Sequence, residues 1–570
     1  MPRVANPDIS VIPLGAASSE CAPVSRVRTA ARVQSRASHA MVLSGCLVLV
    51  LAVQVYGGAY LVEPGRYSDD VSHLMNGLVL RDYLTSALGQ DPMAFAQGYY
   101  ASYPKIAPLM WPPLFHVALG LFLLPGWPAG AGSLVFVGLV AAWLGWRLCT
   151  VARTMGLGTG LWLVPVLVFT TPLVASLFSV VMIDIAIAAL SLEACHWLAR
   201  YWRSGSTRHA ALFGIFVAFA CLSKGNGVAL VLAPAAFMAI TGRFDMLRRP
   251  GLYWAALIVV ALAGPLLLIS ARNDAAIGDF GFITVPEMFR RVGFYSIHLW
   301  RQLGPAVLTF AVFGVIATLR RRRERDTAAV LAAALLAILM ASAAFHILMP
   351  VKAAVSRYLT VAIGPIVVFA LLGAWDAARR VYPVYWRTSA FGLLAALIVV
   401  ATLAARPTVR IVKPLGYRSV VAAMVAAGEL PGRRVLIVGD EVGEGAFVAE
   451  AAISRLSTPP TIVRGSKFLA SDTWNGHNFR MTYTSPEDLY KDLHAYGIEY
   501  VVIDQSEQSL RLGYFNQVKA LTVDRLELVR SDAADGSAVR SIVVFRVPLE
   551  PGAAVLPLQL RPTFGRAKSD

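Results

Sequence analysis

Long uncharged apolar runs dominate the first 405 residues of the chain. Eleven of them are long enough, or nearly so, to cross about 30 Å of hydrocarbon as helices. The pattern therefore predicts a mainly α, polytopic membrane protein with about eleven transmembrane helices over residues 41–405. The predicted spans are Met41–Val62, Ala129–Trp146, Gly156–Val181, Asp184–Ala199, Ala210–Ser223, Gly225–Ile240, Leu252–Ala271, Gln302–Leu319, Ala328–Met349, Tyr358–Trp375 and Thr388–Ala405.

A shorter apolar run, Leu114–Leu124, follows the sequence Trp111-Pro112-Pro113. About a dozen residues are too few to span a bilayer, so we expect this run to lie in the interface or to re-enter the membrane. It belongs to the first long loop, residues 63–128, which is predicted to carry interfacial helices. Loops of this length are usually functional.

The positive charges of the membrane domain gather in alternate loops. If the N-terminus is inside, the inside segments hold 21 of the 31 Lys and Arg residues in positions 1–405, including the run Arg320–Arg323. This distribution follows the positive-inside rule. We therefore expect a cytoplasmic N-terminus and a bacterial inner-membrane protein whose first long loop lies outside. The segment 1–40 is rich in Ala, Ser, Arg and Pro and is predicted to be a disordered cytoplasmic tail.

Residues 406–570 have the composition of a soluble domain, and the odd number of predicted spans places this domain in the periplasm. Strands alternate with helices there, which indicates a small, mainly parallel α/β sheet that ends in a hairpin at Asp535-Gly536. The predicted strands are Arg434–Val438, Thr461–Val463 and Glu499–Ile503, and the predicted helices are Gly445–Ser454, Pro486–Tyr496 and Ser509–Thr522. The turn at 439–445 resembles a phosphate loop only weakly, because it has two acids and no Lys.

Composition excludes a water-soluble enzyme. The chain is 57% hydrophobic and 15% charged, against about 25% charged in soluble domains, and its mean hydropathy is +0.61. Its formal net charge is +17, from 51 Lys+Arg and 34 Asp+Glu. Because most of that excess falls in the inside loops, it records membrane orientation and argues against a nucleic-acid partner. The five cysteines show no disulfide or metal-site pattern.

Two adjacent acids, Asp69 and Asp70, follow the first predicted span. A solvated acidic turn explains such a pair without any function. The functional alternative is a general base or a metal ligand, since neighbouring charge and low-dielectric surroundings raise a carboxyl pKa.

Asp184 and Lys224 are charged residues at the ends of apolar segments, on the same predicted outer face as Asp69. A carboxylate at or within a membrane is energetically costly, so it is first interpreted as a functional residue. The structural alternatives are a helix-start carboxylate for Asp184 and a snorkelling side chain for Lys224. The functional interpretation of Lys224 is phosphate binding, because the glycines beside it let backbone approach closely.

Further cations are predicted at the same outer face. Lys352 and Arg357 precede the tenth span, while the loop between spans seven and eight adds a second group, Arg290, Arg291, His298 and Arg301. Carboxylates and scattered cations beside lipid are typical of a site for a lipid-linked phosphate ester and an incoming hydroxyl.

At this point the sequence resembles the membrane glycosyltransferases of the GT-C fold, specifically the bacterial relatives of family 39, which include protein O-mannosyltransferases and lipid A aminoarabinose transferases. The resemblance covers roughly residues 41–375. Its markers, in order, are Asp69-Asp70, Trp111-Pro112-Pro113-Leu114, Asp184, Leu222-Ser223-Lys224-Gly225 and Lys352–Tyr358.

The resemblance implies a polyprenyl-phosphate-linked sugar donor, an active site on the outer face and transfer with inversion. It gives Asp69 the position of the catalytic acid, Asp70 and Asp184 those of further site acids, and Lys224 that of a donor-phosphate contact. Many relatives carry Glu-Lys before the Pro-Pro pair, where this chain has Met110-Trp111. Lys105 is the residue we expect to substitute for the missing phosphate contact.

We therefore predict a glycosyltransferase, for hexosyl or pentosyl transfer, that moves a sugar to a hydroxyl of an acceptor glycan, lipid or protein. No cofactor is certain; a divalent cation bridging acids and phosphate is an open alternative, although the sequence shows no dedicated cage. The competing classes are a transporter or flippase of lipid-linked sugars and a non-catalytic envelope assembly protein. A transporter would be expected to show internal repeats and broken spans near the midplane, and no such repeat is visible.

Overall fold

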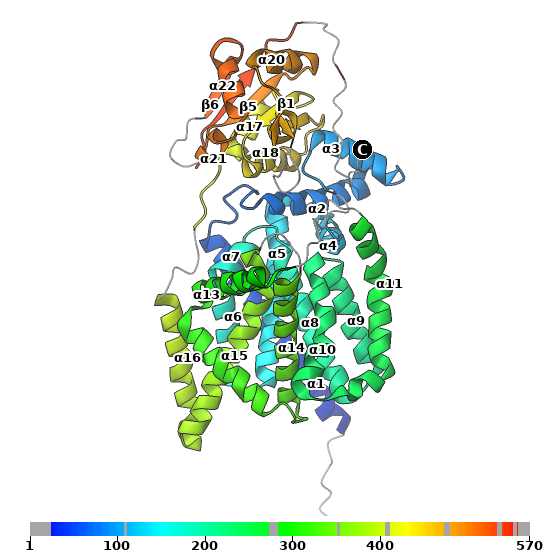
Figure 1. Ribbon diagram of the computed structural model, residues 1–570, viewed down its shortest axis with the longest axis vertical. Helices are drawn as coiled ribbons and strands as arrows, with labels where there is room; N and C mark the ends of the chain where they lie inside the picture. Colours follow the sequence, from blue (N-terminus) through cyan, green and yellow to red (C-terminus); the bar gives the residue numbers. More distant parts are fainter. Residues whose placement is uncertain are drawn as a thin grey trace, which may run out of the picture.

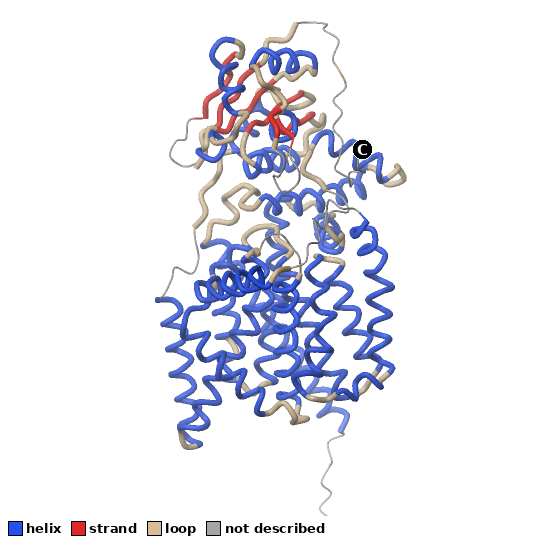
Figure 2. Tube along the Cα trace, in the orientation of Figure 1, coloured by secondary structure: helices blue, strands red, loops and turns tan. Residues whose placement is uncertain are grey.

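The fold combines a helical bundle with an α/β domain at one end of it. A computed structural model describes residues 24–107, 111–272, 283–349, 354–404, 411–471, 479–532, 539–550 and 556. Among the described residues, all strands lie in the α/β domain, and the remaining regular elements are helices joined by loops (Figure 2). The chain is thus mainly α and polytopic, with a C-terminal α/β domain, as the sequence predicts.

Seven helical segments in the described part of the chain are long and apolar enough to cross a membrane. They are Ala37–Tyr56, Ala129–Thr154, Pro250–Ile269, Val285–Arg320, Thr327–Leu348, Ser356–Val381 and Val384–Ala404. The first belongs to α1 (Val24–Tyr56), which begins inside the segment that the sequence predicts to be disordered. The others belong to α5 (Ala129–Thr154), α11 (Pro250–Arg272), α13 (Val285–Arg320), α14 (Thr327–Leu348), α15 (Thr360–Val381) and α16 (Arg387–Ala404).

The remaining predicted spans differ from continuous long helices. The prediction of a single helix over Gly156–Val181 was wrong. This segment divides into η1 (Gly158–Gly160), α6 (Leu163–Phe169) and α7 (Pro172–Phe178). Proline at the start of α7 supplies no N–H and holds the preceding residue extended, which ends α6. Likewise, η2 (Gly225–Leu232) and α10 (Ala233–Thr241) replace a predicted single span, while α8 (Asp184–Ser204) and α9 (Thr207–Cys221) lie close to their predicted bounds.

The segment Val285–Arg320 bends within one apparent helix. Gly304 has φ of 73° and ψ of 168°, which is outside helical geometry, and Pro305 follows it. Glycine tolerates that conformation because it has no Cβ. The predicted span Gln302–Leu319 is therefore the second arm of α13, while the first arm crosses the bundle at a different angle (Figure 1).

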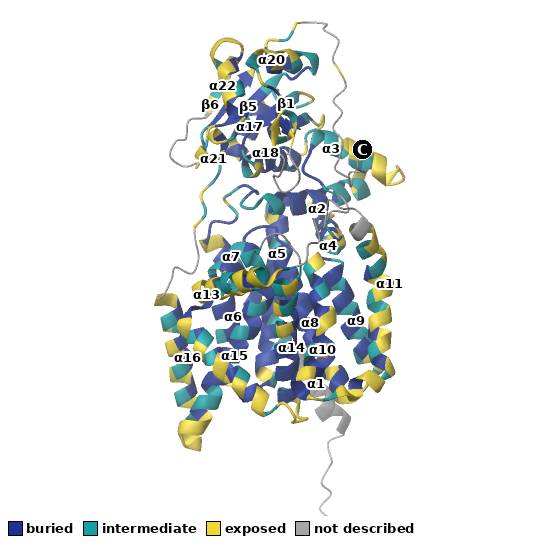
Figure 3. Ribbon diagram, viewed as in Figure 1, coloured by how far each residue is buried: buried dark blue, intermediate teal, exposed yellow. Residues whose placement is uncertain are grey.

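Exposed residues lie on the perimeter of the bundle, and its interior is formed by buried residues (Figure 3). Many of the exposed residues are large and apolar. On α11 and α16 the exposed residues include Trp254, Leu257, Val260, Leu393 and Leu397. Exposed apolar surface of this extent is what a membrane domain presents to lipid.

The first long loop forms three helices at the end of the bundle that faces the α/β domain (Figure 1). They are α2 (Ser68–Ser86), α3 (Pro92–Ser102) and α4 (Leu114–Leu123), the last close to the predicted short run. Glycines allow α2 and α4 to touch, because a Cβ on Gly77 would lie 2.7 Å from the Leu119 side chain.

The α/β domain contains a five-stranded sheet in the order β2-β1-β5-β7-β6. Strands β1 (Arg434–Val438), β2 (Thr461–Arg464) and β5 (Tyr500–Asp504) are parallel, and β6 (Glu527–Asp532) pairs antiparallel with β7 (Ile542–Arg546). The α/β sheet and the terminal hairpin are thus confirmed, but the sheet is mixed and not mainly parallel, because β7 pairs antiparallel with both β5 and β6. The turn Asp535-Gly536 lies outside the described residues. The helices are α17 (Tyr417–Ala426), α18 (Glu441–Ile453), α19 (Gly465–Phe468), α20 (Pro486–Ala495), α21 (Glu507–Leu510) and α22 (Phe515–Asp524), and β3 (Ala470–Ser471) pairs with β4 (Arg480–Met481).

Glu63 fixes the α/β domain to the first loop. Its carboxylate accepts hydrogen bonds from the backbone N–H groups of Leu415, at 2.8 Å, and Gly416, at 2.9 Å. Nearby, Gly65 has φ of +128°, and a Cβ there would lie 3.1 Å from the side chain of Ala446 on α18. The domain therefore rests directly on the segment that leads into Asp69.

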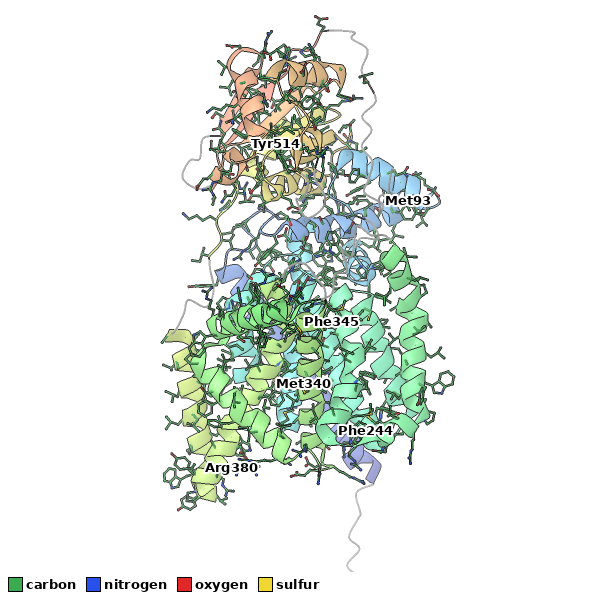
Figure 4. The ribbon with its side chains drawn as sticks, in the orientation of Figure 1. Met93, Phe244, Met340, Phe345, Arg380 and Tyr514 are labelled. Carbon is green, nitrogen blue, oxygen red and sulfur yellow. The ribbon has the colours of Figure 1, made fainter. Side chains whose placement is uncertain are left out.

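The two ends of the bundle differ in what they carry. Phe244 and Arg380 lie at the end opposite Tyr514 of the α/β domain and Met93 of α3 (Figure 4). We call the end that bears α2, α4 and the α/β domain the site end.

Candidate active site

The start of α2 directs two adjacent carboxylates in different directions. Asp70 turns back, and its Oδ2 accepts hydrogen bonds from the backbone N–H groups of Gly65, Arg66 and Tyr67 at 3.0 to 3.4 Å. Its other oxygen is buried without a hydrogen-bond partner. Asp69, one residue earlier and so about 100° around the helix, is 18% exposed and faces a different set of groups.

Asp69 forms an ion pair with Arg357, a residue 288 positions later in the chain. Its Oδ2 lies 2.6 Å from an Nη of Arg357, which belongs to η4 (Ser356–Leu359). The Nε of Arg357 is buried without a hydrogen-bond partner. The guanidinium therefore keeps donor capacity for another anionic group.

A second ion pair joins Asp184 to Lys224. The Lys224 Nζ lies 2.7 Å from Asp184 Oδ1, and Asp184 is 2% exposed. Asp184 Oδ2 is buried without a hydrogen-bond partner, as is Asn226 Oδ1 two residues beyond Lys224. Asp184 is the first residue of α8, but its carboxylate binds the ammonium group and makes no cap for the helix.

The two ion pairs belong to one cluster. Arg357 interacts electrostatically with both Asp69 and Asp184, and Lys224 interacts with both Arg357 and Asp69. The ring of Tyr358 lies 5.3 Å from Lys224 Nζ and stacks on His346 of α14 at 4.7 Å. The structure thus brings together four residues that the sequence analysis singled out from four separate segments.

Sequence reasoning missed a pair of buried histidines beside this cluster. The Nδ1 of His73 lies 3.1 Å from the Nε2 of His116, and the rings of His73 and Trp111 make an edge contact at 5.0 Å. His73 interacts electrostatically with Lys224 and Arg357. The spacing of Asp69 and His73, four residues apart on α2, was the available signal, because such residues share a helix face.

Lys105 lies against the α/β domain and within electrostatic range of Asp69. Its Nζ is 3.6 Å from an Oε of Glu441 at the start of α18, and its side chain is 4% exposed. Burial, aided by the charge of Arg464, lowers the pKa of Lys105 to about 8, while Glu441, Glu444 and Asp69 act in the opposite direction.

Three other predicted site residues, His298, Arg290 and Arg291, make contacts with groups other than the four residues of the cluster. His298 Nδ1 lies 2.8 Å from the carbonyl of Phe294, one turn earlier in its own helix. Arg301 is exposed on the same helix, Arg291 binds Glu287 and the carbonyl of Met349, and Arg290 binds Glu287. Lys352 lies outside the described residues.

The burial of Asp70 predicts an unusual pH dependence of the protein's folding stability. Burial raises its pKa to about 7, against the opposing effect of the N–H groups that it binds. Because the folded-state pKa lies above the unfolded value, the folded state binds the extra proton, and stability is lost as pH rises from about 4 to about 7. The amide of Asp70→Asn keeps the accepting oxygen without the charge. We expect this variant to raise the midpoint of thermal unfolding in detergent at pH 8 and to leave it nearly unchanged at pH 4; an equal effect at both pH values would contradict the assignment.

No group of three or more His, Cys, Asp and Glu side chains within the described ranges is arranged to hold a metal ion. The weak phosphate-loop pattern of the α/β domain is occupied by the protein's own groups. Asp440 accepts the N–H of Gly443 at 2.7 Å, and the Arg540 guanidinium bridges Asp440 and the buried Asp504.

Comparison with known proteins yields structural relatives only. No family model matches the sequence, and neither does any curated protein. Among solved structures, ArnT from Cupriavidus metallidurans bound to undecaprenyl phosphate has a TM-score of 0.51 at 14% identity, covering 88% of this chain and 98% of that chain. ArnT in the apo state has a TM-score of 0.50 with the same identity and coverage. The arabinofuranosyltransferase AftD from Mycobacteria has a TM-score of 0.49 at 14% identity, covering 89% of this chain and 40% of that chain.

ArnT is matched over nearly its whole length, and the 88% of this chain that is covered is too much to come from the helical bundle or the α/β domain alone. The chain therefore has the GT-C fold of polytopic membrane glycosyltransferases.

Proposed function

We propose that the protein transfers a sugar from a polyprenyl-phosphate donor to a hydroxyl group of an acceptor, with inversion, at the outer face of a bacterial inner membrane. The observation that carries this proposal is the cluster of Asp69, Arg357, Lys224 and Asp184 at the site end of the bundle. The similar fold of ArnT, which binds undecaprenyl phosphate, supports a lipid-linked donor.

The cluster supplies both charges that the reaction needs. Asp69 takes the proton of the acceptor hydroxyl as its oxygen attacks the sugar C1. The bond between C1 and the phosphate oxygen breaks, and its electron pair remains on the departing polyprenyl phosphate. Lys224 and Arg357 stabilise that negative charge, which they do more strongly in a site that excludes water.

The two ion pairs of the structure make donor binding and base activation interdependent. Arg357 is paired with Asp69, and Lys224 with Asp184, in the form described above. A donor phosphate competes with both carboxylates for these cations, because charge-assisted pairs with phosphate are strong. Drawing Arg357 toward phosphate frees Asp69 Oδ2 from its ion pair. Donor arrival thereby prepares Asp69 to accept the proton.

In this proposal, the α/β domain and Lys105 lie along the path by which the acceptor reaches Asp69. Glu63 holds the domain directly above the segment leading to Asp69, and Lys105 lies between Glu441 of the domain and Asp69. An acceptor hydroxyl that reaches Asp69 from outside the bilayer passes this region.

The test is a transfer assay with purified protein in liposomes and a panel of labelled polyprenyl-phosphate sugars offered with glycan, lipid and protein acceptors. We expect acceptor-dependent loss of sugar from one donor, with inverted configuration in the product. Movement of an intact donor across the bilayer without cleavage would instead establish the flippase alternative. Absence of both from all donors would contradict the proposal.

A further inference from the structure

His73 and His116 form a hydrogen-bonded pair of buried imidazoles within electrostatic range of the cluster. The carboxylates of Asp69 and Asp184 are each bound to a cation at 2.6 and 2.7 Å. Asp70 is occupied by the three backbone N–H groups that its Oδ2 accepts. The two imidazoles, 1% and 5% exposed, are instead bound to each other.

The hydrogen bond between the rings limits the charge of the pair. A contact of 3.1 Å between Nδ1 of His73 and Nε2 of His116 requires one N–H and one lone pair. Two imidazolium rings cannot make it, so the pair carries at most one positive charge. Burial, with the positive charges of Lys224 and Arg357 and the neighbouring His116, holds the pKa of His73 well below its usual range. The pair is therefore neutral at neutral pH and has room for one proton.

The pair is placed beside the proposed base. Residues four apart on a helix have Cβ atoms about 5–6 Å from each other, so His73 is the α2 neighbour of Asp69. The α4 side of the pair is fixed to the cluster as well, since the N–H of Leu114 donates to the carbonyl of Leu222 at 2.9 Å, two residues before Lys224.

We propose that the His73–His116 pair is the proton relay of the transfer reaction, receiving from Asp69 the proton that the acceptor hydroxyl loses. This inference rests on the proposed function. The acceptor oxygen forms a bond to C1, the bond from C1 to the phosphate oxygen breaks, and its electron pair stays on phosphate. The proton moves from the hydroxyl to Asp69 and then to Nε2 of His73, whose Nδ1–H donates to His116. Asp69 is thereby restored, and the pair returns its proton to solvent after product release.

Charge balance explains why the proton moves at that stage. Before transfer, the positive charges of Lys224 and Arg357 make a further positive charge on His73 unfavourable. Cleavage leaves an additional negative charge on phosphate beside the same two cations. That charge offsets one proton on the histidine pair, so the net charge of the site is the same before and after transfer.

The test compares His73→Gln and His116→Gln with wild type in the transfer assay, measuring kcat and donor Kd across pH. We expect kcat to fall about 10²-fold in His73→Gln and less in His116→Gln, with donor Kd nearly unchanged, as for a lost proton-transfer group. His73 is bound to His116 on α4 and lies within electrostatic range of Lys224 and Arg357, and Asp69 is four residues before it on α2. Protonation of the pair gives wild type an acid limb in kcat, which we expect to disappear in His73→Gln.

His209→Gln is the matched control, because His209 is only partly buried at the start of α9 and bonds Ser204. It should match wild type. Thermal unfolding midpoints separate folding defects from catalytic ones, and His116→Gln serves if His73→Gln does not fold. Wild-type kcat and pH profile in a folded histidine variant, with Asp69→Asn inactive, would overturn the relay and leave the proposed function standing. Absence of transfer by the wild-type protein would instead overturn the function itself.

Discussion

Asp69→Asn is expected to lower kcat for sugar transfer by about 10³-fold while the protein still inserts and folds. An amide has nearly the same shape as the carboxylate and still accepts a hydrogen bond from Arg357, which lies 2.6 Å away. It cannot accept the hydroxyl proton, and a positioned general base is worth roughly 10²–10⁴-fold. Because the donor is held by cations, its Kd should change little. The measurement is kcat and donor Kd in liposomes.

Asp82→Asn is the matched control for this variant. Asp82 is also on α2 and is also paired with an arginine, Arg81, at 2.6 Å. It lies about three turns beyond Asp69, where it bonds Tyr99 of α3. Asp82→Asn should retain transfer close to wild type. If Asp69→Asn retained full activity, or if both variants lost activity equally, the assignment of Asp69 as the base would be wrong.

Lys224→Gln is expected to lower kcat by about 10²–10³-fold, the loss typical of removing one group that stabilises developing negative charge. It should also destabilise the protein, because it leaves the buried Asp184 carboxylate without its cation. Removing one partner of a buried pair typically costs about 3–5 kcal/mol. The variant's unfolding midpoint and its kcat are therefore both expected to fall.

The double variant Lys224→Gln with Asp184→Asn separates these two effects. It removes both charges, so the unfolding midpoint should recover toward wild type, since replacing a whole buried pair is often neutral. Activity should stay low, because the ammonium that faces the donor phosphate is still absent. Recovery of activity together with stability would show that the ion pair is structural and that Lys224 does not act on the phosphate.

Arg147 and Glu193 show that a buried ion pair need not mark a site. Their side chains pair at 2.5 Å between α5 and α8, and Trp143 donates a further hydrogen bond to Glu193 at 2.9 Å. Both oxygens of Glu193 are bound. At the Asp184–Lys224 pair, by contrast, one carboxylate oxygen is buried without a partner. Unsatisfied buried groups are costly, and they distinguish a cluster prepared for a ligand from one that only joins helices.

The sequence by itself determined which part of the chain lies in lipid and which part lies in water. Apolar runs must avoid water and a charged domain must reach it, so the bundle, the short helix near Leu114 and the α/β sheet with its hairpin were all predictable from local pattern. The break in the helix over Gly156–Val181 was less predictable from sequence. Pro172 has no backbone N–H to donate, and whether a new helix starts there depends on which other contacts replace the lost hydrogen bonds.

Only the tertiary structure decided which charges act together. Asp69 and Asp70 are adjacent in sequence, yet one meets Arg357 and the other binds backbone, because successive helical residues point about 100° apart. His73 and His116 are 43 residues apart and become partners only when α2 packs on α4. Pairings of this kind depend on the three-dimensional approach of distant segments. Residue type and spacing therefore identified Asp69, Asp184 and Lys224, whereas packing assigned their partners and added the histidine pair.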